Sequence, residues 1–251
     1  MRAVILAAGR GSRMGRLGDE RPKCLLELGG RPLFEHQVAA LRRGGVNEIG
    51  VVRGYRAAML SFAGYSYFDN ERWADTNMVM SLAAAATWLR SSPVIVSYAD
   101  IFYRGDLVRS LAAAPGPLVI AYDRDWRRLW TRRFADPLSD AETFRVDAAG
   151  ELLDIGGRTG RIEDIQGQYM GLLKFTPAAW RAVEALLGAL DRSVCDRLDM
   201  TGLLRHLLAR SAIAITTVGT DGQWGEIDGP DDAELYQDML RSGELVLDGD
   251  Y

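Results

Sequence analysis

A short apolar strand that runs directly into a glycine-rich loop constrains this chain more than any other feature. Residues 3–6 are apolar, and the loop that follows reads Ala7-Ala8-Gly9-Arg10-Gly11-Ser12-Arg13-Met14. Without side chains at positions 9 and 11, the backbone N–H groups can approach a polyphosphate closely. Arg13 adds a planar fork of donors, and Lys23, which follows a proline, adds a second positive charge. The stretch therefore predicts a loop that holds phosphate groups.

Strands and helices alternate through the first half of the chain. Extended segments are predicted at 48–52, 65–69, 94–97 and 117–122, with helices near 32–43, 77–89 and 104–113. This alternation predicts a parallel sheet with right-handed crossovers. From residue 123 the alternation breaks into a charged aromatic stretch, a hairpin at 144–155, a strand at 167–175 and later helices and strands. We predict an α/β fold in one domain, residues 1–251, with a lid-like insertion at about 123–210.

Composition excludes several classes of protein. With 251 residues, 48% hydrophobic and 25% charged, the chain is typical of a globular protein with a large core. A net charge of −4, with no basic stripe or zinc pattern, argues against nucleic acid as a partner. No apolar run is long enough to cross a bilayer, which argues against a membrane partner. Cys24 and Cys195 form no CxxC pair and no signal-peptide layout opens the chain, so we expect a cytoplasmic location.

Two aspartates follow predicted strands far apart in the sequence. Asp100 follows the strand at 94–97, and Asp228 ends the segment Gly225-Glu226-Ile227-Asp228. The carboxyl ends of strands in an open α/β sheet lie on one rim, so we expect the two side chains to share a site. Carboxylates are natural ligands for Mg²⁺ beside a triphosphate. We predict Mg²⁺ as the cofactor, with Arg13 and Lys23 as the catalytic cations.

The order of these motifs resembles the nucleotidyltransferase superfamily, and in particular its phosphocholine cytidylyltransferase branch. The resemblance rests on the GxGxR loop, the Pro-Lys pair, the segment Asn-x-x-Trp-Ala-Asp-Thr-Asn at 70–77, the Ala-Asp at 99–100 and the Glu-Ile-Asp at 226–228. It extends from residue 1 to about residue 236. It implies a Rossmann-like, mixed, mainly parallel sheet with helices on both faces and a small inserted acceptor-binding or lid region. It also implies Mg²⁺-dependent transfer of CMP from CTP to a small phosphorylated or phosphonate acceptor, with release of pyrophosphate.

The resemblance also implies two sets of binding residues. The branch holds a choline cation with an aromatic ring and a carboxylate, and Trp130 and Asp199 are the positions that look equivalent. An indole face contributes about 1–2 kcal/mol to a desolvated quaternary ammonium, although Trp130 could equally pack in the core and Asp199 could cap a helix. The acceptor set is completed by Tyr169 and Glu226. The nucleotide-binding set is Leu6, Ala8, Gly9, Gly11, Ser12, Arg13, Lys23, Asn77 and Ser81.

Several alternatives stay open at this point. Four arginines, Arg127, Arg128, Arg132 and Arg133, would suit an anionic acceptor and would otherwise form a solvated face. A sugar-1-phosphate nucleotidyltransferase using another NTP shares the opening motif, and a catalytically inactive nucleotide sensor could share the fold. A dinucleotide-dependent dehydrogenase is disfavoured, because Met14 stands where its third glycine would fall. The expected partners are small molecules, with a homodimer as a further possibility.

Overall fold

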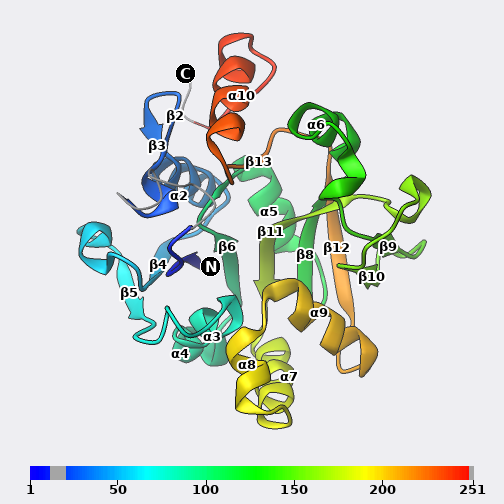
Figure 1. Cartoon of the computed structure of the whole chain (residues 1–251). Helices are drawn as coiled ribbons and strands as arrows, with labels where there is room; N and C mark the ends of the chain where they lie inside the picture. Colours follow the sequence, from blue (N-terminus) through cyan, green and yellow to red (C-terminus); the bar gives the residue numbers. More distant parts are fainter. Residues whose placement is uncertain (12–20, 249–251) are drawn as a thin grey trace.

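A mixed seven-stranded sheet forms the centre of the computed structural model, which describes residues 1–11 and 21–248 (Figure 1). The strand order is β12-β8-β11-β6-β1-β4-β5. Neighbouring strands are parallel except at β11, which is antiparallel to both β6 and β8. The strands are β1 (Arg2–Ala7), β4 (Glu48–Arg53), β5 (Ser66–Asp69), β6 (Val94–Tyr98), β8 (Leu118–Asp123), β11 (Gln168–Phe175) and β12 (Ile215–Thr220).

The middle of this sheet is buried on both faces, as its sequence predicts. In β1, residues Ala3, Val4 and Ile5 are fully buried, and the strand pairs in parallel with both β4 and β6. Near-continuous apolar runs are expected of parallel strands that helices cover on both sides. The predicted mixed, mainly parallel sheet is therefore confirmed.

Helices cover both faces of the sheet and form two separate cores. One core packs beneath α2 (Leu33–Arg43), α5 (Gly105–Ala113), α6 (Trp126–Arg133) and α10 (Pro230–Arg241). The other packs beneath α3 (Met78–Ala83), α4 (Ala86–Ser91), α7 (Pro177–Gly188) and α9 (Met200–Ala209), with α8 (Arg192–Arg197) beside them. None of the helices within the described residues is both long and apolar enough to span a bilayer.

Short elements complete the fold and connect it to the site. β7 (Ile101–Phe102) pairs with β13 (Gly225–Glu226), which joins the end of β6 to a segment more than a hundred residues later. The others are η2 (Lys23–Leu25), β2 (Glu27–Leu28), β3 (Arg31–Pro32), η3 (Ala57–Leu60), η4 (Pro137–Ser139), β9 (Phe144–Val146), β10 (Leu152–Ile155) and η5 (Ile162–Asp164).

The structure differs from the sequence prediction in three places. The single helix predicted at 77–89 is two helices, α3 and α4, because the backbone leaves the helical conformation at the buried Ala85 (φ −90°, ψ 16°). The charged stretch after residue 123 contains a helix, α6, whose apolar side joins the core. The strand predicted at 167–175 is β11 in the middle of the sheet, so this part of the predicted insertion belongs to the core sheet.

Candidate active site

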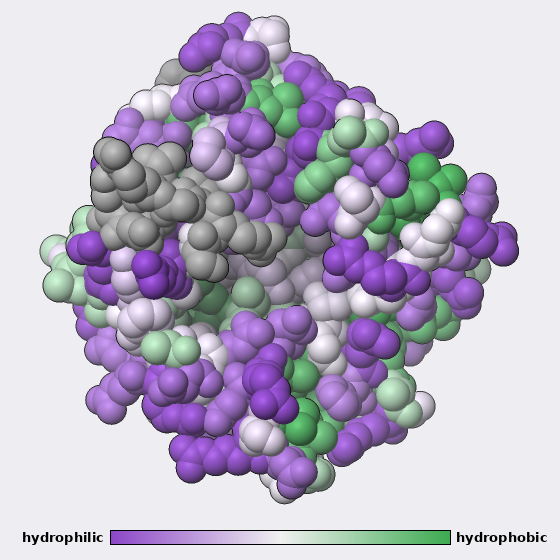
Figure 2. Space-filling view, in the orientation of Figure 1, coloured by the Kyte–Doolittle hydropathy of each residue, from purple (hydrophilic) through white to green (hydrophobic). Residues whose placement is uncertain are grey.

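A cavity opens where β1 and β6 end, beside the glycine-rich loop. In the space-filling view this face of the molecule is hollowed near its centre, with hydrophilic residues around the hollow (Figure 2). Every described residue of the predicted nucleotide-binding set lines this cavity, which we call the nucleotide cavity after that prediction. Ser12 and Arg13 lie outside the described residues. The predicted residues that line it are Leu6, Ala8, Gly9, Gly11, Lys23, Asn77 and Ser81, together with Asp100.

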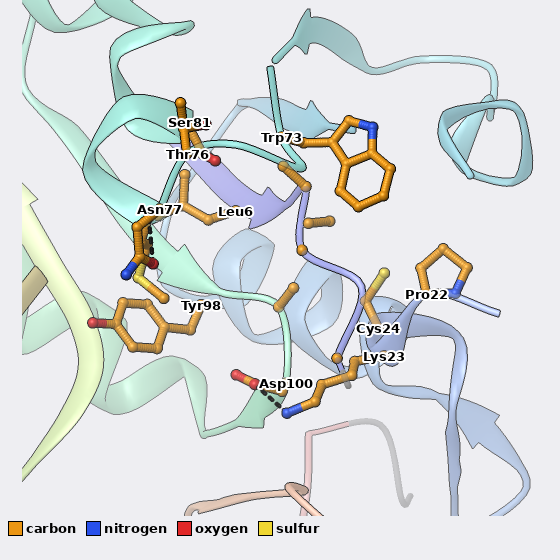
Figure 3. Close-up of a pocket in the computed structure, with 16 residues that line it drawn as sticks. Leu6, Pro22, Lys23, Cys24, Trp73, Thr76, Asn77, Ser81, Tyr98 and Asp100 are labelled. Atoms are coloured by element: carbon orange, nitrogen blue, oxygen red, sulfur yellow. Dashed lines mark hydrogen bonds and ion pairs between the residues drawn. The ribbon is translucent and has the colours of Figure 1, made fainter. Parts of the chain in front are cut away.

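Lys23 lies between the two aspartates that the sequence singles out. Its Nζ is 3.0 Å from Oδ2 of Asp100 and 2.6 Å from Oδ1 of Asp228. Figure 3 shows Lys23 and Asp100 pointing toward each other at one end of the cavity. The path of the lysine requires a glycine in the loop, because Gly11 has φ +68° and a Cβ there would lie 2.7 Å from Cγ of Lys23. The structure thus brings the loop, the lysine and both carboxylates together.

The pairing of β7 with β13 explains how Asp228 reaches Asp100. The backbone N–H of Ile227 donates to the carbonyl of Asp100 at 2.9 Å, so Asp100, which precedes β7, and Asp228, which follows β13, lie next to the same strand pair. Asp232, at the start of α10, accepts hydrogen bonds from the N–H groups of Asp228 (2.9 Å) and Gly229 (3.1 Å). The carboxylate of Asp228 therefore projects from a backbone that is fixed on two sides.

Electrostatics keep the lysine charged within this cluster. Burial opposes the charge of Lys23, but attraction to Asp100 and Asp228 outweighs it and raises the pKa of the ammonium above its ordinary value. Within the described residues no group of three or more His, Cys, Asp or Glu side chains gathers around a single point. Two carboxylates nevertheless fit Mg²⁺, which proteins commonly bind through one or two carboxylates together with substrate phosphates.

Arg133 is buried and forms ion pairs with two carboxylates close to Asp228 in the sequence. Its side chain is 1% exposed and forms ion pairs with Glu226 (2.8 Å) and with Asp232 (2.8 Å). Arg132 and Arg128 both pair with Glu244. The prediction that these arginines would either bind an anionic acceptor or form a solvated face is therefore wrong for Arg133, because two carboxylates hold it in the interior.

A second cavity of about 290 Å³ adjoins the first, and Tyr98 lines both. Three of the predicted acceptor residues, Trp130, Tyr169 and Glu226, line it together with Asp228, and we call it the acceptor cavity after that prediction. Asp199 is not among the residues that line it. Its Oδ1 accepts a hydrogen bond from the N–H of Gly202 at 2.7 Å, so Asp199 caps the N-terminus of α9.

Trp130 lines this cavity and contacts the cationic side chain of Arg133. Its side chain is 3% exposed, its indole N–H donates to Asp140 at 3.1 Å, and the guanidinium of Arg133 is 5.1 Å from its ring centre. Burial beside Asp228 raises the pKa of Glu226 to about 7, although the neighbouring Arg133 acts in the opposite direction. The acceptor cavity thus holds a carboxyl group that titrates near neutral pH.

Sequence reasoning assigned no binding role to several residues that line the two cavities, although Trp73 belongs to the segment 70–77 that carries the resemblance. In the nucleotide cavity Trp73 packs over the end of β4, where a Cβ on Gly54 would lie 2.5 Å from Cβ of Trp73. The glycine at this strand end was the available signal, since it makes room for a large neighbour. The acceptor cavity adds Gln168, at the start of β11, and four residues from loops without apolar periodicity, which leave no such signal: Asp140, Glu142, Thr143 and Arg158.

Comparisons with known proteins place this arrangement in a class. The solved structure of the inositol-1-phosphate CTP transferase from T. maritima has a TM-score of 0.73 and 17% identity, covering 98% of this chain and 97% of that one. The CTP:phosphocholine cytidylyltransferase from Streptococcus pneumoniae has a TM-score of 0.69 and 20% identity, covering 95% and 98%. The fold is therefore that of the nucleotidyltransferases.

Sequence comparison gives the family. The model of the MobA-like NTP transferase domain matches residues 3–201, and the chain belongs to this family. A CTP:phosphoglutamine cytidylyltransferase from Campylobacter jejuni is 35% identical, covering 94% of this chain and 98% of that protein. The choline-phosphate cytidylyltransferase of Streptococcus pneumoniae is 29% identical over 61% of this chain and 67% of its own length.

Proposed function

We propose that this protein transfers CMP from CTP to a small phosphorylated acceptor and releases pyrophosphate. The observation that carries the proposal is the meeting of two cavities at Lys23, Asp100 and Asp228. One cavity is lined by the glycine-rich loop, and the other by polar side chains. The names of the relatives from Campylobacter jejuni and Streptococcus pneumoniae support the same reaction type, with phosphoglutamine and choline phosphate as their acceptors.

In this reaction an oxygen of the acceptor phosphate attacks the α-phosphorus of CTP, and the bond from that phosphorus to the bridging oxygen of the leaving group breaks. The electron pair of the broken bond leaves with pyrophosphate. The protein has to align two anions that repel each other and to neutralise charge on the leaving group. The backbone of the glycine-rich loop would hold the triphosphate, and Lys23, with Arg13 from the same region of sequence, would neutralise it.

Asp100 and Asp228 would hold Mg²⁺, because paired carboxylates beside a phosphate site match its preference for oxygen ligands. When bound, the ion polarises phosphate oxygens and reduces the repulsion between the two substrates. Lys23 occupies the space between both carboxylates, so a cation that takes its place would make the ammonium available to phosphate oxygens. The lysine is thereby suited to act on the substrate.

The proposal is tested by measuring pyrophosphate release with Mg²⁺ and each NTP in turn. The acceptors are phosphoglutamine, phosphocholine, phosphoethanolamine, 2-aminoethylphosphonate and glucose-1-phosphate. Release with CTP and one of the first four supports a cytidylyltransferase. Release only with the sugar phosphate replaces it by a sugar-1-phosphate nucleotidyltransferase. CTP binding in calorimetry without release from any acceptor indicates a nucleotide sensor.

A further inference from the structure

Two opposite charges line the acceptor cavity without pairing with each other. Glu142 precedes β9 and Arg158 follows β10, and the two short strands place both residues at the same cavity. The backbones beside them are joined, because the N–H of Thr143 donates to the carbonyl of Gly157 at 2.8 Å. Neither charged side chain forms an ion pair with any described residue, although each lies within the other's electrostatic influence. A gap therefore separates a carboxylate from a guanidinium.

Both groups are held in position by neighbours. The backbone of Glu142 is clamped by the buried side chain of Gln168 on β11, which accepts from its N–H (3.4 Å) and donates to its carbonyl (2.9 Å). One terminal nitrogen of Arg158 donates to the carbonyls of Ser139 (3.1 Å) and Asp140 (3.2 Å). The remaining N–H groups of this guanidinium, and the carboxylate of Glu142, have no hydrogen-bond partner among residues 1–11 and 21–248.

The remaining lining of the cavity restricts the ligand further. Three more acidic residues, Asp140, Glu226 and Asp228, line the same cavity. Although Glu226 pairs with Arg133 and Asp228 with Lys23, the lining holds more acidic than basic side chains, which disfavours an anionic head group. A simple cation such as choline would leave Arg158 without a partner. The hydroxyl of Tyr169 is buried beside Tyr98 and adds one neutral polar group to the lining. A zwitterion with one ammonium and one carboxylate satisfies both unpaired charges.

Burial gives a further reason for expecting an ammonium at Glu142. Partial desolvation raises the pKa of this carboxyl group, and the nearby Asp199 and Asp140 act in the same direction, while Arg158 and, more weakly, Arg205 oppose them. A bound ammonium would stabilise the ionised form and remove this cost. Hydrogen bonds between charged partners are stronger than those between neutral groups, so they favour a head group that forms them over one that does not.

We propose that the acceptor cavity recognises the α-amino acid head group of the phosphorylated acceptor, with Arg158 binding its carboxylate and Glu142 binding its ammonium. This inference rests on the proposed cytidylyltransferase function and names its specificity-determining residues. The planar fork of the guanidinium matches a carboxylate in two parallel hydrogen bonds. Both residues act on acceptor affinity, whereas Lys23, Asp100 and Asp228 act on the transfer itself.

The test pairs each variant with a substrate that lacks the matching group. KM and kcat for CMP transfer are measured with three acceptors that share a phosphorylated amide. They are phosphoglutamine, phosphorylated 4-aminobutyramide, which lacks the carboxylate, and phosphorylated glutaramate, which lacks the ammonium. Arg158→Gln should raise KM for phosphoglutamine about 10- to 100-fold with little change in kcat. It should leave KM for the compound without the carboxylate unchanged. Glu142→Gln should raise KM for phosphoglutamine and leave the compound without the ammonium unaffected.

Matched controls are Arg161→Gln and Glu163→Gln, whose side chains are 74% and 70% exposed and do not line the cavity. Arg158→Lys serves as a second variant should the glutamine variant fold poorly, and it should recover only part of the affinity. Equal losses with all three acceptors would assign Arg158 a structural role and overturn the inference. Wild-type preference for phosphocholine over phosphoglutamine would overturn it as well. Absence of CMP transfer to every acceptor would instead overturn the proposed function.

Discussion

The two cavities meet at the same charged cluster of Lys23, Asp100 and Asp228, but different kinds of residues line them. The nucleotide cavity is lined by small residues of the β1 loop, by residues 73–81 around the start of α3 and by the end of β6, with Lys23 as its positive charge. The acceptor cavity is lined by polar side chains from α6, β9–β11 and the loops between them. Backbone groups and small residues suit the part of the substrates that is the same for all enzymes of one reaction type. Projecting side chains suit the part that varies, and they can be replaced without moving the sheet.

The largest effect should come from the cluster that both cavities share. Lys23→Ala should lower kcat/KM about 100-fold or more with every acceptor, because it removes a charge that neutralises the leaving group. Steady-state kinetics with two different acceptors would measure this. Lys23→Arg, which keeps the charge, should retain more activity than Lys23→Ala. Near-normal turnover in a folded Lys23→Ala protein would remove this residue from the mechanism.

The metal proposal predicts a shift in Mg²⁺ dependence. Asp100→Asn and Asp228→Asn should each raise the Mg²⁺ concentration for half-maximal activity about tenfold or more, since a neutral amide is a poorer ligand for a hard cation. Mg²⁺ titrations of both variants would be compared with Asp231→Asn, an exposed position on α10. A shift in only one of the two variants would contradict a site made of both carboxylates.

The acceptor cavity should also make stability depend on pH. Folding raises the pKa of Glu226 from 4.5 to about 7, so the folded chain binds more protons than the unfolded chain between these values. The free energy of unfolding therefore falls as pH rises through this window. The variant Glu226→Gln has no carboxyl group at this position and therefore does not lose stability in this way. Between pH 5 and pH 8 the difference in free energy of unfolding between the variant and the wild type should shift in favour of the variant by about 1–3 kcal/mol.

Urea denaturation at both pH values measures the effect of Glu226. Glu234→Gln, at an exposed position on α10, is the control and should follow the wild-type profile. Parallel profiles for wild type and Glu226→Gln would mean that Glu226 titrates near its ordinary value. The comparison of the two cavities predicts no similar effect from Lys23, because its raised pKa leaves it charged throughout this range.

The smallest effects should come from the two residues first identified with a choline-like head group. Trp130→Phe keeps an aromatic ring but loses the hydrogen bond to Asp140, and it should raise KM for the acceptor about threefold while KM for CTP stays unchanged. Asp199→Asn keeps a good helix cap, so any change in acceptor KM would report the lost charge alone. A change in KM for CTP in either variant would contradict the proposal that CTP and the acceptor bind in separate cavities.

Sequence reasoning could predict the nucleotide cavity because its parts follow rules of local structure. A glycine-rich loop after an apolar strand and an aspartate after another parallel strand converge wherever a parallel sheet forms, as Lys23 and Asp100 do. Asp228 reaches them by a different route, through the antiparallel pairing of β7 with β13. It could not predict that β11 lies between β6 and β8, because pairing partners of a strand depend on contacts far away in the chain. Without that order, Tyr169 and Gln168 have no assigned neighbours.

The arginine-rich stretch illustrates the same limit. In the sequence, Arg132 and Arg133 are equivalent members of one charged run. In the structure, Arg133 is 1% exposed and pairs with Glu226 and Asp232, whereas Arg132 is 36% exposed and pairs with Glu244. Which arginine is buried depends on how α6 rotates against α10, and local charge patterning carries no information about that rotation.

The position of β11 makes the acceptor-binding region exchangeable as a unit. Gln168, the first residue of β11, pairs directly with Asp123, the last residue of β8, so the segment 124–167 leaves and re-enters the sheet at neighbouring points. A segment with adjacent ends can be replaced by one of another length at a small cost in chain entropy. Transplanting it from a relative with a different acceptor should change the acceptor while CTP stays the donor. Arg133 has to be retained in such a graft, because it holds the aspartate that orients Asp228.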